Sequence, residues 1–440
     1  MTTRDLVAVV DQVRFEAHVW GKVNQAVQAI VEQVDGLRLP KENFDPNFFA
    51  EAIRGHNDVA KKVGDRCTEG VDVTKKIQVL LEGFTEHYRR LAVSEGQAIN
   101  PPRTAPPMQQ GTPTQERDNL RSGMGLPSIQ EMEGHLKSLR DGAAELARKI
   151  VELRTKANQT LHELETTMWR WFMPGLAALI RAIREVTTRM LDFCSGYLQI
   201  VAWVLQQARL CIAMYDDSLK WVEVRAKANE IQGWLAPAVL NPERAAPAGR
   251  ARRAWHGEVE AAYAAAIPGQ TNAASAIGLM GLVTAGSVMG CFGAQVYVFS
   301  NVSSVLIDVT TAIGELIVKI VARNVTIDWY DLFFSRLPTW AKAAKETLLA
   351  ALQAEATSKF NAQVFRMLVI DNSAFTYRAD LRLYDSLSQL PQAWPDPTRA
   401  GVDWPREVRN QRGDLLRWEV SREVNPRPRP DELIGPRRRR

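Results

Sequence analysis

The sequence predicts an all-α protein made of long helical hairpins and a helix bundle with a coiled-coil-like segment. Apolar residues recur every three or four positions in several separate segments, which is the pattern of one helix face. Alternation of the kind that predicts strands is missing at useful length, and only residues 366–384 are ambiguous. Segments rich in Pro and Gly separate the helical runs and predict disordered linkers and a disordered C-terminal tail. We therefore expect most of residues 1–390 to be helical.

Residues 1–98 predict an N-terminal helical hairpin. Apolar residues at helical spacing run from Leu6 to Val34, and Gly36 and Pro40 then interrupt the pattern. A second helical run follows, and it starts with Asp followed by Pro, a common pair at the N-terminus of a helix. Residues 99–127 come next and are so rich in proline that they predict a linker without a packed core.

The clearest pattern in the chain is a seam over residues 129–168. Ser128 and Glu131 form a capping box at its start, and apolar residues then alternate spacings of three and four with charged residues between them. Two readings stay open for this seam. It forms an oligomerisation stalk, or it packs inside the molecule against another long helix.

The rest of residues 128–390 predicts a long-helix bundle. Pro174 should restart the chain as a helix that runs to about Trp234, and residues 235–253 form a second linker. A short helix is expected to end at Ile267, before Pro268, and helical spacing then resumes. Beyond the bundle, residues 391–440 are rich in Pro and Arg and predict a disordered basic tail.

Residues 276–299 are the most apolar part of the chain. They lack charged side chains and are long enough to cross a bilayer. Gly286 and Gly290 have the small-xxx-small spacing that lets two helices approach closely, so we predict a helix–helix contact there. The segment is read either as a tightly packed buried helix or as a point of membrane contact.

No motif in the sequence predicts catalysis, a cofactor or a metal site. The four Cys and six His are scattered without metal-ligand or redox spacing, and neither a nucleophile elbow nor a phosphate loop occurs. The protein is therefore predicted not to be an enzyme. The net charge is +5, and nearly all of this excess falls in residues 391–440, which argues against a nucleic-acid-binding domain.

A short motif suggests a family. Trp255-His-Gly257, followed by Tyr263, then Pro-Gly-Gln270 and a long helix rich in Ala, Gly and Val, resembles the WXG100-like proteins of actinobacterial type VII (ESX) secretion systems. The resemblance covers roughly residues 176–325. Residues 1–95 are similar to the small ESX-associated hairpin proteins, with Trp20-Gly21 in place of W-x-G.

The resemblance implies two antiparallel helices that meet at a turn shaped by Trp255 and Gly257, with Tyr263 as part of the motif. It also implies a non-enzymatic, exported protein that acts through helical assembly, either with a helical partner or with itself. Asp5 and Arg14 interrupt any apolar leader, so the expected route to the medium or the envelope is independent of Sec. The family's Tyr-x-x-x-acid export signal does not occur, which places that signal on a partner.

Two alternatives from other classes stay open. One is a membrane-active helical protein, pore-forming or holin-like, that uses residues 276–299. The other is a cytoplasmic scaffold with a coiled-coil stalk.

Overall fold

The computed structural model confirms the all-α fold class in the part of the chain that it describes. Residues 3–37, 39, 50–99, 101, 112–166, 175–239 and 258–322 are described, together with positions 339, 342, 346, 376–378, 383–385 and 394. The helices are α1 (Thr3–Asp35), α2 (Ala50–Ser94), α3 (Pro113–Gly123), α4 (Ile129–Thr166), α5 (Leu176–Gln206), α6 (Ala208–Val239) and α8 (Glu258–Val321). Two short antiparallel strands, β1 (Thr376–Arg378) and β2 (Leu383–Asp385), fall at the end of the one stretch that was ambiguous in sequence.

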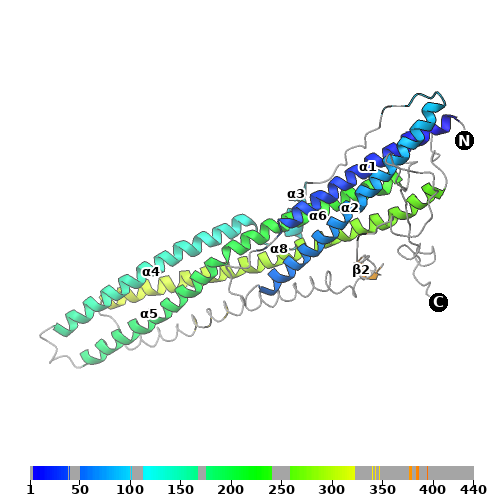
Figure 1. The fold of residues 1–440 in the computed structure, drawn as a ribbon. Helices are drawn as coiled ribbons and strands as arrows, with labels where there is room; N and C mark the ends of the chain where they lie inside the picture. Colours follow the sequence, from blue (N-terminus) through cyan, green and yellow to red (C-terminus); the bar gives the residue numbers. More distant parts are fainter. Residues whose placement is uncertain are drawn as a thin grey trace, which may run out of the picture.

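The helices form an elongated rod (Figure 1). The α1–α2 pair lies at one end and the α4–α5 pair at the other. Helix α8 runs along both parts, and α6 lies beside α1 and α2. Helix α8 has 64 residues, which corresponds to a length of about 95 Å. Only Gln207 separates α5 from α6, so these two helices follow each other along the rod.

Helix α6 packs against α8 in the antiparallel sense. Gly278 of α8 lies beside Ala228 of α6, and farther along α8 the ring of Phe292 lies 5.0 Å from the ring of Tyr215. As the residue numbers rise in α8, those of its α6 partners fall. The α6–α8 pair is therefore a long antiparallel hairpin, and its connection spans residues 240–257, outside the described part of the chain.

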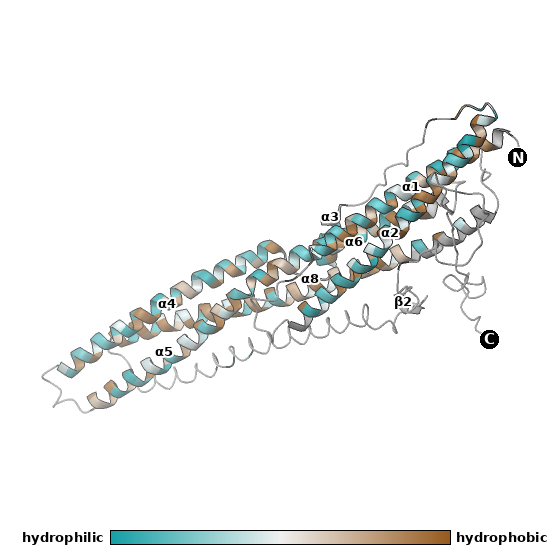
Figure 2. Cartoon of the chain, viewed as in Figure 1, coloured by the Kyte–Doolittle hydropathy of each residue, from teal (hydrophilic) through white to brown (hydrophobic). Residues whose placement is uncertain are grey.

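Helix α4 packs against α8 in the parallel sense. The hydroxyl groups of Ser138 and Ser303 lie 2.8 Å apart, and Gly142 contacts the side chain of Leu306. In Figure 2 the apolar side of α4 faces its neighbours, and its polar side faces outward. The described part of the seam thus packs inside the molecule against another long helix. This is the second of the two readings, and not the oligomerisation stalk. Its buried residues are Met132, Leu136, Leu139, Leu146, Leu153, Ala157, Thr160, Leu161 and Leu164.

The N-terminal hairpin is part of the same bundle. Asn24 of α1 donates hydrogen bonds from Nδ2 to the carbonyl oxygen of Val71 and to the hydroxyl of Thr74 on α2, both at 2.8 Å. Gln33 of α1 donates to Glu223 of α6 at 2.6 Å. Buried residues of α1, α2, α4, α5, α6 and α8 belong to one continuous apolar core. The hairpin is therefore not a separate globular unit.

The predicted linker at 99–127 was wrong in its second half, where α3 forms. The Thr112 hydroxyl accepts a hydrogen bond from the backbone of Gln115, and Pro113 occupies the first turn. Helix α3 then packs on α6, because the Arg117 guanidinium lies 4.3 Å from the centroid of the Tyr215 ring. The capped first turn and the cation–π contact stabilise a helix here, although composition alone predicts a disordered segment.

The predicted end of a helix at Ile267 was also wrong, since α8 runs through Pro268 without interruption. A proline in a helix removes one hydrogen bond and strains the preceding turn. Here Ile267 and Gln270 on either side are each 1% exposed. Burial of both flanks outweighs the local cost of the proline.

The apolar segment 276–299 lies in the middle of α8, and most of its side chains are buried in the bundle. Within the described residues, none of the helices combines the length and the apolarity that a membrane span needs.

The close approach between α8 and α6 occurs at Gly281, outside the Gly286–Gly290 pair for which a helix–helix contact is predicted. A Cβ atom added to Gly281 would lie 2.8 Å from the carbonyl oxygen of Trp221. A Cβ atom on Gly286 would meet no described atom within 4 Å, and Gly290 is half-buried. Gly281 and Gly286 differ in this respect because residues five positions apart on a helix point in different directions.

The two glycines provide a matched test of this packing. Gly281→Ala should lower the free energy of unfolding by about 1–3 kcal/mol, because the α6 backbone must move. Gly286→Ala should leave it unchanged or raise it by up to about 1 kcal/mol through helix propensity. Chemical denaturation of both variants measures the difference. Equal effects at the two positions would contradict the α6–α8 register.

Candidate functional site

The structure describes only one of the three predicted motif residues. Trp255 and Gly257 lie outside the described residues, and α8 begins at Glu258, directly after them. Tyr263 lies near the start of α8 and is 4% exposed. It is therefore held inside the bundle, close to the connection that carries W-x-G.

Tyr263 joins α8 to α1. Its hydroxyl accepts a hydrogen bond from Nε1 of Trp20 at 2.7 Å and donates one to Oε2 of Glu16 at 3.0 Å. Trp20 is 1% exposed and Glu16 is 3% exposed, so these bonds form away from water. We call this set the Trp20–Tyr263 junction. It brings together two aromatic residues that the sequence analysis placed in separate hairpins.

The location of Trp20 corrects its comparison with a W-x-G turn. Trp20-Gly21 lies in the middle of α1, and the N-terminal hairpin reverses after Asp35 instead. Trp20 therefore does not close a hairpin tip. Its indole ring instead fills the interface between α1 and the first turns of α8.

A second polar cluster lies where α2 meets α6. Nε2 of His56 accepts a hydrogen bond from Nε1 of Trp221 at 2.9 Å, and it lies 3.7 Å from Oδ2 of Asp217. The other ring nitrogen of His56 lies 3.2 Å from Oδ1 of Asn57. His56 is 1% exposed and Trp221 is fully buried. We call this set the His56 cluster.

The His56 cluster also holds the chain that leaves α1. The side chain of Asn57 accepts from the backbone N–H of Leu39 at 3.0 Å and donates to its carbonyl oxygen at 3.1 Å. Lys220 donates to the carbonyl oxygen of Gly36 at 3.3 Å and forms an ion pair with Asp217 at 3.2 Å. The cluster therefore fixes the end of α1 and the start of α2 on α6.

Burial sets the protonation of this cluster. Loss of hydration lowers the pKa of His56 from 6.5 to about 4, helped by the positive charge of Lys220 and opposed by the hydrogen bond to Asn57. Burial raises the pKa of Asp217, although Lys220 acts in the opposite direction. Because Trp221 donates to Nε2, the imidazole is neutral and carries its proton on Nδ1. Sequence analysis missed this cluster, since His56 and Trp221 are 165 positions apart.

The cysteines and the metal-ligand residue types are dispersed in the described part of the chain. All four Cys are free and buried, and burial raises the pKa of the Cys67 and Cys194 thiols to about 12. No group of three or more His, Cys, Asp or Glu among the described residues is placed to hold a metal ion.

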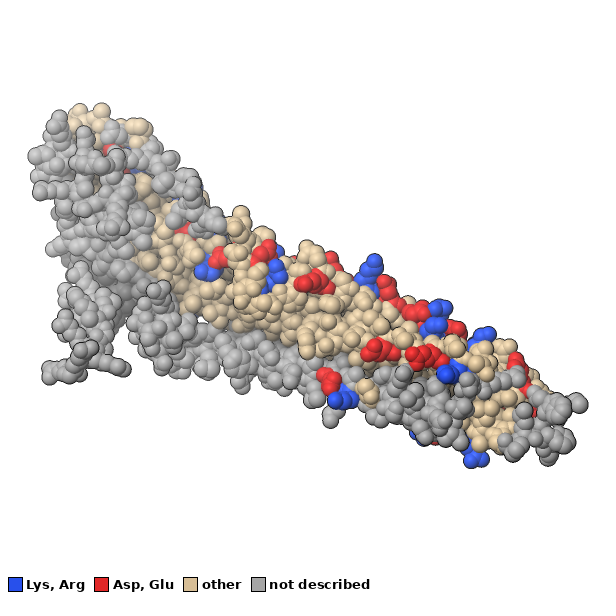
Figure 3. All heavy atoms as spheres, turned by 180° about the vertical axis from the view of Figure 1, so that it is seen from behind, with Lys and Arg blue, Asp and Glu red and all other residues tan. Residues whose placement is uncertain are grey.

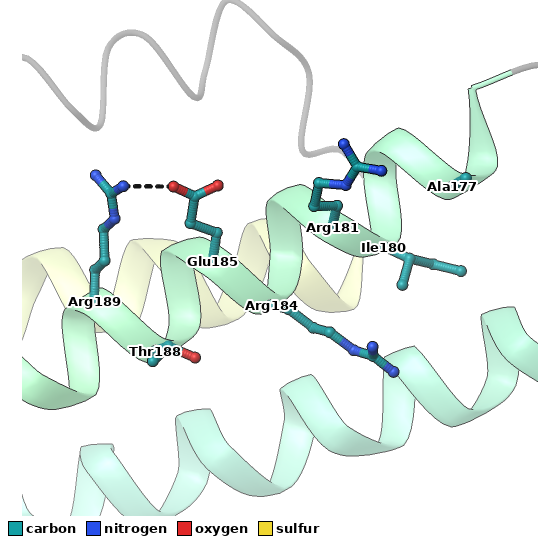
Figure 4. A pocket seen from close by; sticks show the side chains of 7 residues that line it. All are labelled: Ala177, Ile180, Arg181, Arg184, Glu185, Thr188 and Arg189. Carbon is teal, nitrogen blue, oxygen red and sulfur yellow. Dashed lines mark hydrogen bonds and ion pairs between the residues drawn. The ribbon is translucent and has the colours of Figure 1, made fainter.

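A surface recess on α5 has a volume of about 570 Å³ (Figure 4). Its charges are largely paired: Arg189 bonds Glu185 on the same helix, and Arg184 reaches Glu165 of α4. Positive and negative side chains are also mixed along the face drawn in Figure 3. The recess therefore shows no strong preference for an anionic or cationic ligand. Its lining residues are Ala177, Ile180, Arg181, Arg184, Glu185, Thr188 and Arg189.

Comparison of the chain with protein-family models, with curated proteins and with solved structures gives no match. The candidate site is therefore defined by geometry alone. It consists of the Trp20–Tyr263 junction and the His56 cluster, two buried polar contacts by which the N-terminal hairpin is joined to the α6–α8 hairpin.

Removal of one oxygen atom tests the Trp20–Tyr263 junction. Tyr263→Phe should lower the free energy of unfolding by about 1–3 kcal/mol, because the indole N–H of Trp20 loses its acceptor in a buried place. Tyr297 lies on the same helix and is 61% exposed, so Tyr297→Phe is the control and should change stability by less than about 0.5 kcal/mol. Thermal denaturation of both variants measures this difference in stability. A Tyr263→Phe variant as stable as the control would show that the junction does not stabilise the fold.

The His56 cluster predicts an acid-sensitive stability. The pKa of His56 is about 4 in the folded protein and 6.5 without burial, so the unfolded state takes up the proton first. His56 therefore leaves stability intact above pH 6.5 and reduces it as the pH falls towards 4, by up to roughly 3 kcal/mol. The raised pKa of Asp217 acts in the opposite sense in acid.

The comparison with His56→Gln isolates the histidine, because Gln also offers an acceptor to Trp221 but does not titrate. Urea denaturation at several pH values should show a steeper loss of stability below pH 6.5 in the unaltered protein. Identical pH profiles for the two proteins would rule out a role for His56 protonation.

Proposed function

We propose that this chain is a non-enzymatic, type VII (ESX) secretion-associated protein that leaves the cytoplasm folded and acts through helical assembly. The observation that supports the proposal most is the α6–α8 pair. Two long antiparallel helices are joined by a connection that carries Trp255-His-Gly257, and α8 starts at the next residue. This is the order helix, W-x-G, helix on which the resemblance rests.

The packing of the hairpin suits a protein that is moved and assembled as a folded body. Gly278 and Gly281 bring α8 close to α6, and Tyr215 of α6 packs on Phe292 of α8. Such contacts give a stiff pair of helices because close-packed side chains resist sliding. The Trp20–Tyr263 junction adds the N-terminal hairpin to this body.

The proposal includes a helical partner or a second copy. The Tyr-x-x-x-acid signal does not occur in the sequence, so export would depend on a partner that carries it. The described part of the 129–168 seam is occupied within the chain by α8 and α5. We therefore expect the partner to bind another face of the rod.

Fractionation of producing cells tests the proposal. The protein should appear in the medium or the envelope of cells that have the ESX ATPase gene and the partner gene, and it should stay inside cells that lack either gene. A cytosolic marker enzyme controls for lysis. Retention in the cytosol of the strain that has both genes would contradict export and favour the scaffold alternative.

Two neighbouring substitutions test the motif itself. Trp255→Ala should lower export, because the W-x-G turn loses its large side chain. His256→Ala changes the variable position of the motif and should leave export unchanged. Both variants need a helical circular dichroism spectrum like that of the unaltered protein. Equal export of the two variants would show that the W-x-G turn is not required for export.

A further inference from the structure

A tryptophan from the C-terminal part of the chain is seated between α2 and α8. Trp394 is 5% exposed, and its Nε1 donates a hydrogen bond to Oε1 of Gln270 at 2.6 Å. Its backbone N–H donates to Oε2 of Glu69 at 3.1 Å. Gln270 is itself 1% exposed. The predicted disorder of residues 391–440 is therefore wrong at this position, because a buried acceptor holds the indole ring.

The seat exists because α2 has a glycine there. A Cβ atom added to Gly70 would lie 2.7 Å from two ring carbons of Trp394, Cδ2 and Cε3. Real side chains do not approach so closely, so any larger residue would displace the ring. We define the Trp slot as Glu69 and Gly70 of α2 with Gln270 of α8.

The ring in the slot connects two helices that have few direct contacts. The main partner of α2 is α1, and those of α8 are α6 and α4. Trp394 contacts α2 through Glu69 and Gly70 and contacts α8 through Gln270. It therefore bridges the N-terminal hairpin and α8.

We propose that the Trp slot is a recognition site for a tryptophan followed by proline, and that the C-terminal segment of the chain is its tethered, reversible ligand. Pro395 favours an extended backbone at Trp394, in which the backbone N–H and the indole can both reach their acceptors. The proposal concerns binding within the chain and does not depend on export.

The sequence offers a second ligand of the same kind, Trp404-Pro405. The residue before the tryptophan differs, since Ala393 precedes Trp394 and Asp403 precedes Trp404. That residue lies next to the N–H that binds Glu69, so an aspartate there places two negative charges near each other. The slot therefore prefers Trp394, and Glu69 sets the preference.

A labelled peptide tests the site in the full-length protein. A fluorescein-labelled peptide of residues 389–399 is titrated with the unaltered chain and with a Trp394→Ala/Trp404→Ala double variant, and anisotropy is measured. The double variant has no tethered tryptophan–proline pair to fill the slot and should bind about tenfold or more tightly than the unaltered chain, whose tethered ligand competes at an effective concentration on the order of millimolar. Equal binding by the two proteins overturns the proposal.

Substitutions on α2 locate the binding. Added to the double variant, Gly70→Ala should abolish binding because its Cβ fills the ring position. Gly64→Ala is the control on the same helix, since its Cβ would meet Val34 at an ordinary 3.5 Å, and it should bind normally. Gln270→Ala removes only the indole acceptor and should weaken binding in a second, independent variant. Circular dichroism verifies the fold of each protein. Undiminished binding by Gly70→Ala or by Gln270→Ala in a folded protein overturns the assignment of the slot.

The second ligand tests the preference. A peptide of residues 399–409 should bind the double variant several-fold more weakly than the first peptide does. Glu69→Gln added to the double variant should reduce this difference in affinity, because the amide keeps an acceptor but loses the charge. Equal binding of the two peptides overturns selection by Glu69. A version of the first peptide with Ala in place of Trp should not bind at all, and its binding would overturn recognition of the indole.

Discussion

The structure depends on the removal of α8 from water. Residues 261–307 contain no Asp, Glu, Lys or Arg, so this part of the helix has no charged face to present to solvent. An uncharged helix of this kind is stable in water only when other elements cover it on several sides. Helix α6 covers one side in the antiparallel sense, α4 covers another in the parallel sense, and the N-terminal hairpin reaches its first turns. The rod shape follows, because the helix to be covered is long and every covering helix must lie along it.

Apolar burial alone does not fix how these helices slide or rotate against one another. Polar groups within the interfaces provide that selection, because each buried donor needs its acceptor in one place. The hydroxyl of Tyr197 on α5 donates to the carbonyl oxygen of Val302 on α8 at 2.8 Å. At the other end of α8 the Trp20–Tyr263 junction has the same role, and the His56 cluster sets α2 against α6. A shift of one helical turn would break these bonds together, so the registers of the pairs are mutually dependent.

Helical periodicity was enough to predict the fold class, the seam of α4 and the N-terminal hairpin. It could not identify which helix the seam faces, because periodicity defines a face and not its partner. The same limit explains the glycines: Gly281 and Gly286 look alike in sequence, and only the rotation of α8 decides which one meets Trp221. Helix α3 was missed although its Thr112-Pro113 start is readable, because the surrounding prolines dominate the composition. Its stabilising contact with Tyr215 is tertiary.

The candidate site was less predictable for the same physical reason. Tyr263 was singled out with the motif, but its bond to Trp20 joins residues 243 positions apart. Trp394 lies in a stretch whose composition indicates disorder, and its burial depends on Gly70 of a distant helix. No local pattern in the sequence predicts the contact of Tyr263 with Trp20 or that of Trp394 with Gly70.

The length of α8 has a mechanical consequence. The helix contacts α1 at Tyr263 and α4 at Leu306, points that lie roughly 65 Å apart along a straight helix. A continuous helix packed on both sides strongly resists compression and stretching along its axis. A force applied along the axis at the N-terminal hairpin would therefore be transmitted through α8 to the α4–α5 end, and the molecule would move as one rigid body.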